Sequence, residues 1–392
     1  MSDNKSFFTK AVHAGEDTSE HHGALSVPIY NASTYAFENA DEGKAIHNYE
    51  KHGYFYGRLG NPTQEALEKA VAELENGEAA IAFASGMAAI SAAVLSLVKT
   101  GEHIVALDSM YSTSSIFFQN ISETLGIDIT YVDATDAVNY ENAIRPETRM
   151  LWIETPSNPR LNITDISAVV EVAKANNILT VADNTFASPF NQNPIDFGVD
   201  VVMHSATKYL GGHSDLSAGI LVGSNEIIDE IYKKGVKLFG GGIAPQVAWL
   251  VLRGIKTLAL RMKQHNKNAY AIANMLQNHI KVKEVFYPNL ESHKNKEIAR
   301  KQMRGFGGMI SFDVGGIEEG KTFINNLEIC SIATSLGGVE SIVQHSASMT
   351  HATLSKEERE KAGISDGLIR FSVGIEDKED LIRDLENALN KI

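Results

Sequence analysis

Six short apolar runs between residues 79 and 223 constrain the fold of this chain more than any other feature. They recur at intervals of about 20 to 45 residues, and stretches with helical periodicity lie between several of them. A crossover between parallel strands needs a dozen or more residues, whereas a hairpin needs only a few. The spacing therefore predicts an α/β fold with a mainly parallel sheet. The runs are AAIAFA (79–84), HIVALD (103–108), RMLWIE (149–154), ILTVAD (178–183), DVVMHS (200–205) and AGILVG (218–223).

The length of the chain predicts more than one hydrophobic core, because 392 residues exceed the size at which single cores stop growing. We expect an irregular arm over 1–60 that reaches a neighbouring subunit, since this stretch is rich in Gly, Asn, His and Tyr and shows little periodicity. A large α/β domain is predicted over 61–255 and a smaller α+β domain over 256–392. A long helical stretch that begins at Pro245 is expected to link them.

Composition and charge exclude several classes of function. The formal net charge of −14 argues against binding to nucleic acid or to an anionic membrane surface. No apolar run approaches the roughly 18 residues of a membrane span, and the amino terminus lacks the apolar core of a signal peptide. We therefore expect a cytoplasmic protein. Cys330 is the only cysteine, so no disulfide can form within the chain, and its apolar surroundings predict a buried side chain.

The stretch HSATKYLGGHSD places one lysine, Lys208, directly after an apolar run. A lysine that does chemistry needs a partly buried site, and open α/β sheets bind ligands where their strands end. Taken alone, Lys208 fits a surface lysine better. Two other strand ends favour chemistry, because Asp183 could hold a pyridinium N–H and SGM (85–87) could offer helix N-terminal N–H groups to a phosphate. With the hydroxyls of Ser205 and Thr207, the set suits a phosphorylated pyridine aldehyde.

Eight short motifs, in this order and spacing, are similar to a known family. The chain resembles the pyridoxal phosphate (PLP) enzymes of cysteine and methionine metabolism, which include cystathionine γ-synthase, cystathionine γ-lyase and methionine γ-lyase. The resemblance covers nearly the whole chain and implies the aspartate aminotransferase-like fold (fold type I). The motifs are YGRLGNPT (56–63), SGM (85–87), ETPSNP (154–159), DNT (183–185), SATK (205–208), SLGG (335–338), MTH (349–351) and RFSVG (370–374).

The resemblance implies a role for each residue that would hold the cofactor. Lys208 would carry the Schiff base, Asp183 would pair with the pyridine nitrogen, and Asn158 would contact the phenolic oxygen. The phosphate would be held by four residues of the same chain and by two from the neighbouring subunit. A homo-oligomer with shared sites, typically a tetramer built from dimers, is therefore implied. The four are Gly86, Met87, Ser205 and Thr207, and the two are Tyr56 and Arg58.

The same resemblance implies the residues that would act on the substrate, a small amino acid. Tyr111 would stack on the cofactor ring and exchange a proton at the substrate side chain. Arg370 would hold the substrate carboxylate with two hydrogen bonds. Ser335 and Thr113 would line the substrate pocket. Without the family pattern, Tyr111 and Tyr56 would be read as half-buried aromatic residues and Arg370 as an edge-strand cation.

The implied reaction is γ-elimination from a sulfur amino acid, which converts methionine to methanethiol, 2-oxobutanoate and ammonia. Three positions depart from the family patterns. Thr334 replaces the Glu that is usual in members that act on cystathionine, whereas Thr113 replaces a Cys and Leu238 an Asp that are typical of methionine γ-lyase. Cystathionine γ-lyase, cystathionine γ-synthase and O-acetylhomoserine sulfhydrylase activities therefore remain alternatives, the last two by γ-replacement.

Two further patterns could indicate other functions. GGIEEGKT (315–322) fits the P-loop pattern of nucleotide-binding proteins, but its two Glu residues would oppose phosphate binding. Histidines at 21–22, and the pair His345 and His351, do not supply a set of three metal ligands, so no metal site is expected.

Overall fold

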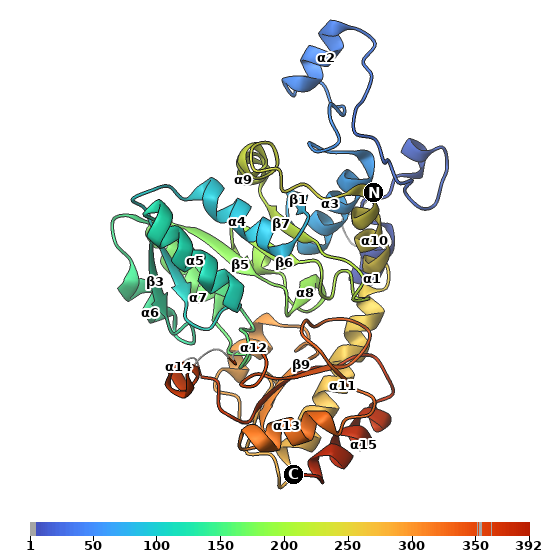
Figure 1. Ribbon diagram of the computed structural model, residues 1–392. Coiled ribbons are helices and arrows are strands. Elements are labelled where there is room, and N and C mark those ends of the chain that lie inside the picture. Colours follow the sequence, from blue (N-terminus) through green and yellow to red (C-terminus); the bar gives the residue numbers. More distant parts are fainter. Residues whose placement is uncertain (1–4, 351, 353–354, 362) are drawn as a thin grey trace.

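Two β-sheets, each with its own hydrophobic core, organise the computed structural model of the chain. The structure describes residues 5–350, 352, 355–361 and 363–392. The seven-stranded sheet and its helices form the upper body in Figure 1, and the five-stranded sheet forms the lower body. The boundaries predicted at 60/61 and 255/256 remain predictions, but the expected α/β class with a mostly parallel large sheet is confirmed.

The large sheet has the strand order β1-β7-β6-β5-β4-β2-β3. All six apolar runs form strands in it. β3 was not predicted, because it is a short edge strand whose side chains are half exposed and carry little apolar signal. The strands are β1 (Ala79–Phe83), β2 (His103–Leu107), β3 (Asp128–Val132), β4 (Thr148–Glu154), β5 (Leu179–Asp183), β6 (Val201–Ser205) and β7 (Gly219–Gly223).

Strand β7 departs from the parallel arrangement, since it runs antiparallel to both β1 and β6. The connection from β6 to β7 is made of turns and contains no helix, so the chain reverses instead of crossing over. Thr207 and Lys208 lie on this connection, directly beyond the end of β6.

Helices cover both faces of the large sheet. Asn61 caps α3 by accepting a hydrogen bond from the N–H of Gln64, and Asn76 ends that helix in a left-handed conformation. Ser205 faces α4, whereas the preceding residue, His204, faces α3, so these two helices lie on opposite faces. The helices are α3 (Pro62–Glu75), α4 (Gly86–Leu97), α5 (Ser112–Leu125), α6 (Ala137–Ala143), α7 (Ile166–Ala175), α8 (Ser188–Asn191), η2 (Pro194–Phe197), α9 (Asn225–Ile231), the π-helical turn η3 (Tyr232–Val236) and α10 (Pro245–Ile255).

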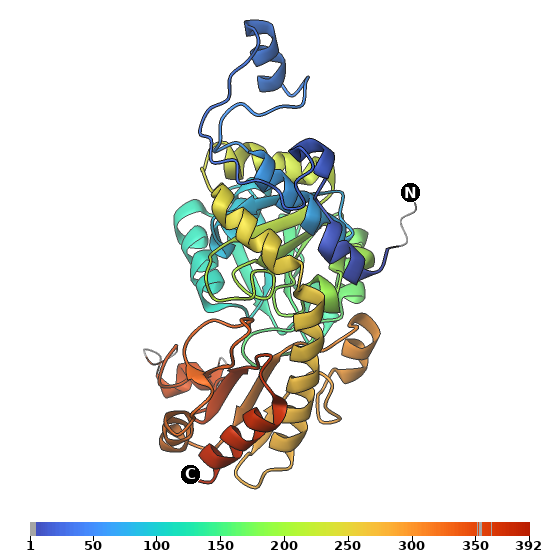
Figure 2. The ribbon, with the colours of Figure 1, turned by 90° about the vertical axis from the view of Figure 1, so that its right-hand side faces the viewer.

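The helical stretch expected from Pro245 is two helices, not one. α10 ends at Ile255 and α11 (Leu258–Gln277) begins three residues later. The guanidinium of Arg261 stabilises the break between the two helices. It donates to the carbonyl of Gly254 at 2.7 Å and to that of Tyr209 at 2.7 Å. Figure 2 shows α11 running down from the upper body along the lower one, and its side chains contribute to both cores.

The small sheet has the order β10-β11-β12-β9-β8. Cys330 is buried beside it, as predicted. The GGIEEGKT string is no phosphate loop, because α13 begins at Ile317 and both Glu318 and Lys321 already lie within the helix. The elements are β8 (Glu284–Phe286), α12 (Lys296–Gln302), β9 (Met309–Asp313), α13 (Ile317–Asn325), β10 (Ser331–Ile332), β11 (Ile342–His345), α14 (Lys356–Lys361), β12 (Leu368–Ser372) and α15 (Lys378–Leu389).

The first 60 residues contain α1 (Phe7–His13), η1 (Thr18–His21) and α2 (Ala40–His47). The segment around α2 projects away from both bodies (Figures 1 and 2). It carries exposed aromatic side chains, among them Tyr49, Phe55 and Tyr56. Exposed aromatic residues on a projecting segment are typical of a surface that another chain covers.

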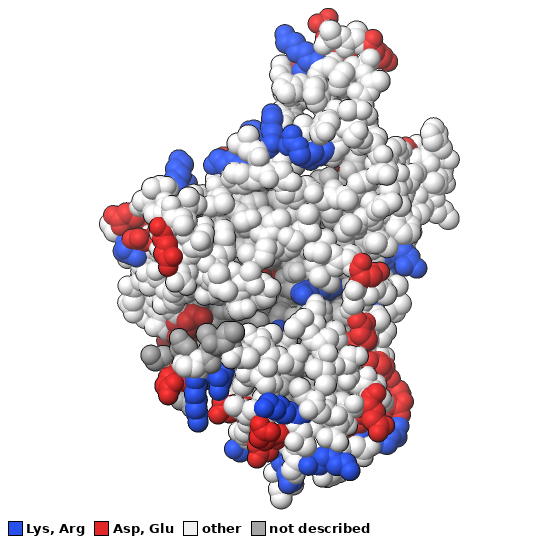
Figure 3. All heavy atoms as spheres, in the orientation of Figure 1, with Lys and Arg blue, Asp and Glu red and all other residues white. Residues whose placement is uncertain are grey.

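Within the described part of the chain, no helix combines the length and apolar character needed to cross a membrane. The described residues also contain no group of three or more His, Cys, Asp or Glu side chains that could hold a metal ion, and His351 lies outside them. On the face seen in Figure 3, charged side chains gather toward the periphery, and much of the surface of the upper body carries no charge.

Candidate active site

A cavity of about 550 Å³ lies where β4, β5 and β6 end and the small sheet faces the large one. It brings together residues that the sequence scatters over positions 85 to 370. All the predicted site residues line it except Tyr56 and Arg58. Those that do are Gly86, Met87, Tyr111, Thr113, Asn158, Asp183, Ser205, Thr207, Lys208, Ser335 and Arg370.

The N-terminus of α4 forms one wall of this cavity. The Ser85 hydroxyl caps the helix by accepting a hydrogen bond from the N–H of Ala88 at 3.1 Å. A Cβ atom on Gly86 would stand 3.0 Å from the Ser205 side chain, so only glycine leaves this space open. The helix N-terminus favours anions, and the Ser205 and Thr207 hydroxyls line the same cavity. This wall, the anion cup, is therefore suited to a phosphate.

Two carboxyl groups lie side by side at the ends of β4 and β5, where Glu154 and Asp183 are register partners. Burial raises the pKa of Asp183, while hydrogen bonds from Thr185 and the positive charges of His204 and Lys208 oppose this rise. Burial and the charge of Asp183 raise the pKa of Glu154 well above its usual range. Of the two, Asp183 is therefore the carboxyl better suited to stay ionised and pair with a cation.

Glu154 begins the ETPSNP motif, and the sequence predicts no role for it, although its place at a strand end could have singled it out. Its carboxyl accepts a hydrogen bond from the N–H of Tyr111 at 2.9 Å and another from the N–H of Asn158 at 3.2 Å. It thus fixes the backbone of two predicted site residues. Thr185 and Gln344 also line the cavity and were not predicted.

The amine of Lys208 lies within the cavity and donates to the Ser335 hydroxyl at 2.6 Å. Burial, together with the nearby charge of Arg370, lowers the pKa of Lys208 to about 8, against the opposing effect of Asp183. Ser335 has a positive φ of 83°, which is uncommon for a residue with a side chain. Backbone strain of this kind gathers at functional sites.

Arg370, on β12, reaches the cavity from the small sheet and is 9% exposed. Its guanidinium donates to Asn158 Oδ1 at 3.2 Å, to the carbonyl of Ser335 at 2.8 Å and to Gln344 Oε1 at 3.1 Å. Burial lowers the pKa of Arg370 to about 10. An arginine held in this way is rigid, and two of its five N–H groups are left to donate to a carboxylate.

Tyr56 and Arg58 lie outside the cavity of their own chain. The Arg58 guanidinium donates to the carbonyls of Lys237, at 2.8 Å, and Val236, at 3.3 Å, and stands 5.9 Å from the Tyr56 ring. Leu238 is 72% exposed and likewise does not line the cavity.

The donor set in the cavity fits a phosphorylated pyridine aldehyde. It offers an anion cup at α4, a carboxylate in Asp183 and an amine of lowered pKa in Lys208. These are the three groups that pyridoxal phosphate requires of a protein.

Comparisons with known proteins agree with this chemistry. The family model described as "Cys/Met metabolism PLP-dependent enzyme" matches residues 8–390. The L-methionine gamma-lyase of Fusobacterium nucleatum subsp. nucleatum is 47% identical over 387 residues, 98% of each chain. The cystathionine gamma-lyase of Bacillus subtilis is 46% identical over 384 residues, 98% of this chain and 99% of that one. The crystal structure of cystathionine gamma-lyase from Lactobacillus plantarum complexed with L-serine matches with a TM-score of 0.93 at 40% identity, covering 99% of both chains.

Proposed function

Since this chain belongs to the Cys/Met metabolism PLP-dependent enzyme family, we propose that its cavity catalyses γ-elimination from a sulfur amino acid. The observation that carries the proposal is the convergence of Lys208, Tyr111 and Arg370 on one cavity. The reaction needs three groups from a protein. In our assignment Lys208 would be the base at Cα, Tyr111 the acid at the leaving sulfur and Arg370 the cation that binds the carboxylate.

Pyridoxal phosphate, when bound, withdraws electrons from the Cα of an amino acid and so makes its proton acidic. In our assignment Lys208, Asp183 and Asn158 hold the ring end of the cofactor. Gly86, Met87, Ser205 and Thr207 are assigned to its phosphate.

The residues of the chain would then move the protons. The Lys208 amine would take the proton from Cα, and its lowered pKa suits that task near neutral pH. A second proton would then leave Cβ, and the electron pair freed there would expel the sulfur from Cγ. As the Cγ–S bond breaks, the Tyr111 phenol would give a proton to the sulfur, so that a thiol leaves. Hydrolysis of the remaining four-carbon fragment gives 2-oxobutanoate and ammonia. Arg370 would hold the substrate carboxylate throughout.

Methionine is our first choice of substrate. Thr113 and Thr334 line the cavity, and neither carries the negative charge that would attract a second, distal ammonium group. The relatives named L-methionine gamma-lyase support this choice, while the relatives named cystathionine gamma-lyase keep cystathionine as the second candidate. Homocysteine has the same four-carbon chain as methionine and is a further candidate substrate.

Product formation from four substrates tests the proposal. The purified holoenzyme should release 2-oxobutanoate from methionine, and also from homocysteine or cystathionine, without an added thiol. O-acetylhomoserine, with and without added thiol, serves as the comparison for γ-replacement. If product formed only from the acylated homoserine plus thiol, the lyase assignment would fail and a replacement enzyme would take its place.

We also propose that the chain acts as a homo-oligomer, most simply a tetramer of paired dimers, in the cytoplasm. Tyr56 and Arg58 stand outside the cavity of their own chain, on an N-terminal region whose aromatic side chains are exposed. In a dimer they would complete the phosphate site of the partner. Each cavity would then need two chains.

A further inference from the structure

Arg261, on α11, is a buried arginine that pairs with no carboxylate in the described part of the chain, and it is 4% exposed. Its guanidinium donates instead to the backbone carbonyls of Tyr209 and Gly254, each at 2.7 Å, and to the Thr257 hydroxyl at 3.1 Å. Charged side chains are rarely buried without an opposite charge, because leaving water is costly. The position of Arg261 therefore points to a role in holding the segments that carry these carbonyls.

One of these segments is the turn that begins at Lys208. Tyr209 directly follows Lys208, and the N–H of Gly212 donates to the carbonyl of Lys208 at 2.7 Å. Gly212 has a φ of 74°, and a Cβ atom there would stand 2.1 Å from Nη1 of Arg261. Only glycine allows so close an approach in this conformation. The guanidinium thus binds the turn at Tyr209 and packs against it at Gly212.

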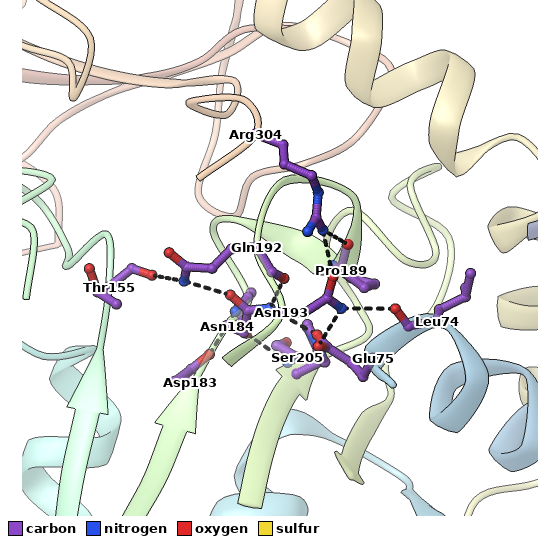
Figure 4. A network of polar contacts seen from close by, with 12 residues as sticks. Leu74, Glu75, Thr155, Asp183, Asn184, Pro189, Gln192, Asn193, Ser205 and Arg304 are labelled. Atoms are coloured by element: carbon purple, nitrogen blue, oxygen red, sulfur yellow. Dashed lines mark hydrogen bonds and ion pairs between the residues drawn. The ribbon is translucent and has the colours of Figure 1, made fainter. Parts of the chain in front are cut away.

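The chain before Lys208 is held by other contacts. β6 lies within the large sheet between β5 and β7, and the N–H of Ser205 donates to the Thr185 hydroxyl at 2.8 Å. On the far face of the sheet, the Gln192 amide joins the ends of β4 and β5, since it donates to the carbonyl of Thr155 and to Asn184 Oδ1 (Figure 4). The turn after β6 lies outside the sheet, so its position depends on the side chains that pack against it.

Helix α11 gives this contact a fixed base. It is 20 residues long and contributes to the cores of both bodies. One helical turn beyond Arg261, the ring of His265 packs edge-on against the Tyr209 ring, with 5.2 Å between the centroids. Nδ1 of His265 also lies 2.7 Å from the carbonyl of Val373, directly after the strand that carries Arg370. The same helix therefore contacts the chain on both sides of the cavity.

We propose that Arg261 is a positioning residue that fixes the turn after β6, so that the Lys208 amine stands where it can bond to the cofactor aldehyde. The inference rests on the assignment of Lys208 to that aldehyde. Arg261 does not line the cavity and touches no reacting atom, so it acts only through the backbone that follows Lys208. Without the guanidinium the turn can shift, and bond formation depends steeply on the position of the amine.

Binding of two ligands to the full-length apoprotein tests the role of Arg261. One is pyridoxal phosphate, and the other is pyridoxine phosphate, which has an alcohol in place of the aldehyde and cannot bond covalently to Lys208. Arg261→Met should weaken binding of pyridoxal phosphate about tenfold or more, through the misplaced amine, and binding of pyridoxine phosphate less than about twofold. Equilibrium titration would measure both. Equal losses for the two ligands, or no loss for either, would overturn the proposal.

Two further variants keep the test decisive. Arg261→Lys keeps the charge and should fold even if Arg261→Met does not. Its single nitrogen cannot reproduce the planar contacts with both carbonyls, so its loss should again be larger for pyridoxal phosphate, and an equal loss would overturn the proposal. Arg304 likewise donates to backbone carbonyls, those of Pro189 and Phe190, but away from Lys208. Arg304→Met is therefore the matched control, and any loss it causes should be equal for both ligands.

The unaltered apoprotein separates this proposal from the assignment on which it rests. It should bind pyridoxal phosphate more tightly than pyridoxine phosphate, because only the aldehyde can bond to Lys208. If it showed no such preference, the assignment of Lys208 would fail instead, independently of Arg261.

Discussion

At the scale of single residues, Lys208 combines a partly buried amine with a short hydrogen bond to Ser335, whose backbone is strained. Its surroundings favour the neutral amine, which is the form that attacks an aldehyde. The neighbouring positive charge of Arg370 acts in the same direction as burial, while Asp183 opposes both. Lys208 lies beyond the end of β6 and is partly buried in the cavity. The lowered pKa that results makes its amine suitable for covalent chemistry near neutral pH.

The first prediction concerns the pH dependence of cofactor capture. The rate at which the apoprotein binds pyridoxal phosphate should rise as the pH rises through about 8, because Lys208 loses its proton there, and should then level off. Rapid-mixing absorbance measurements would follow the rate, with an N-acetyl-lysine amide as control. A midpoint near 10.5, the ordinary pKa of lysine, would show that the cavity does not lower the pKa of Lys208.

The second prediction concerns Arg370. Arg370→Lys keeps a positive charge but loses the planar pair of donors, so kcat/KM should fall about 10- to 100-fold, mainly through KM, as about 1.5–3 kcal/mol of charged hydrogen bonding is lost. Steady-state kinetics with methionine would measure this. Arg300→Lys, at a surface ion pair with Glu291, is the matched control and should change little. A KM within twofold of that of the unaltered enzyme would remove Arg370 from the carboxylate site.

Reasoning from strand ends singled out Lys208, Asp183 and Ser205, because they follow apolar runs that are easy to recognise, whereas Tyr111 and Arg370 were implied only by the family resemblance. It gave no role to Glu154, whose contacts are with backbone groups of Tyr111 and Asn158 and leave no pattern in the sequence. It also could not find the buried contact between Glu75 and His204, which lie 129 positions apart and meet only because α3 packs against the large sheet.

At the scale of elements, α4 and the connection after β6 are the parts that create the anion cup. The close approach of α4 to Ser205 depends on Gly86. The sequence predicted the strands of this region but not the reversal of β7, because orientation depends on whether a helix intervenes, and the connection from 206 to 218 has little periodicity. The break between α10 and α11 was missed for a similar reason, since it depends on contacts made by Arg261 with distant carbonyls.

The third prediction tests the cup. Gly86→Ala should weaken binding of pyridoxal phosphate by roughly tenfold or more, since the added methyl group would crowd the Ser205 hydroxyl and narrow the anion site. Binding of pyridoxal, which lacks the phosphate, should change much less. Equilibrium titration of the apoprotein would measure both. Gly320→Ala, in helix α13 beside the small sheet, is the control, because its methyl group would meet the His345 ring instead. An equal effect of Gly86→Ala on the two ligands would place the damage outside the anion cup.

At the scale of the whole molecule, the two bodies meet around the cavity, with the strand ends of one facing Arg370 of the other. The projecting N-terminal segment exposes aromatic side chains that its own chain does not cover. The irregular composition of residues 1–60 suggested this arm. The sequence could not place it, because residues 1–60 show no periodic pattern that would indicate their contacts, and their binding to a neighbouring subunit stays a prediction.

The fourth prediction tests the shared site. Arg58→Ala and Lys208→Ala chains should each be inactive or nearly so. After the two are unfolded, mixed and refolded together, about a quarter of the unaltered activity should return, since half of the random dimers are hybrids with one intact site of two. Light scattering would confirm a mass that is a multiple of 42.7 kDa. Absence of recovery in verified hybrids would place Arg58 in a site within a single chain.

The most direct test of the central claim is product release from methionine by the holoenzyme and by Lys208→Ala. The unaltered enzyme should form 2-oxobutanoate and methanethiol in equal amounts, and its visible cofactor band should be present. Lys208→Ala should keep the circular dichroism spectrum of the fold but lose that band and form neither product. Turnover of methionine by the folded variant at a rate near that of the unaltered enzyme would contradict the account.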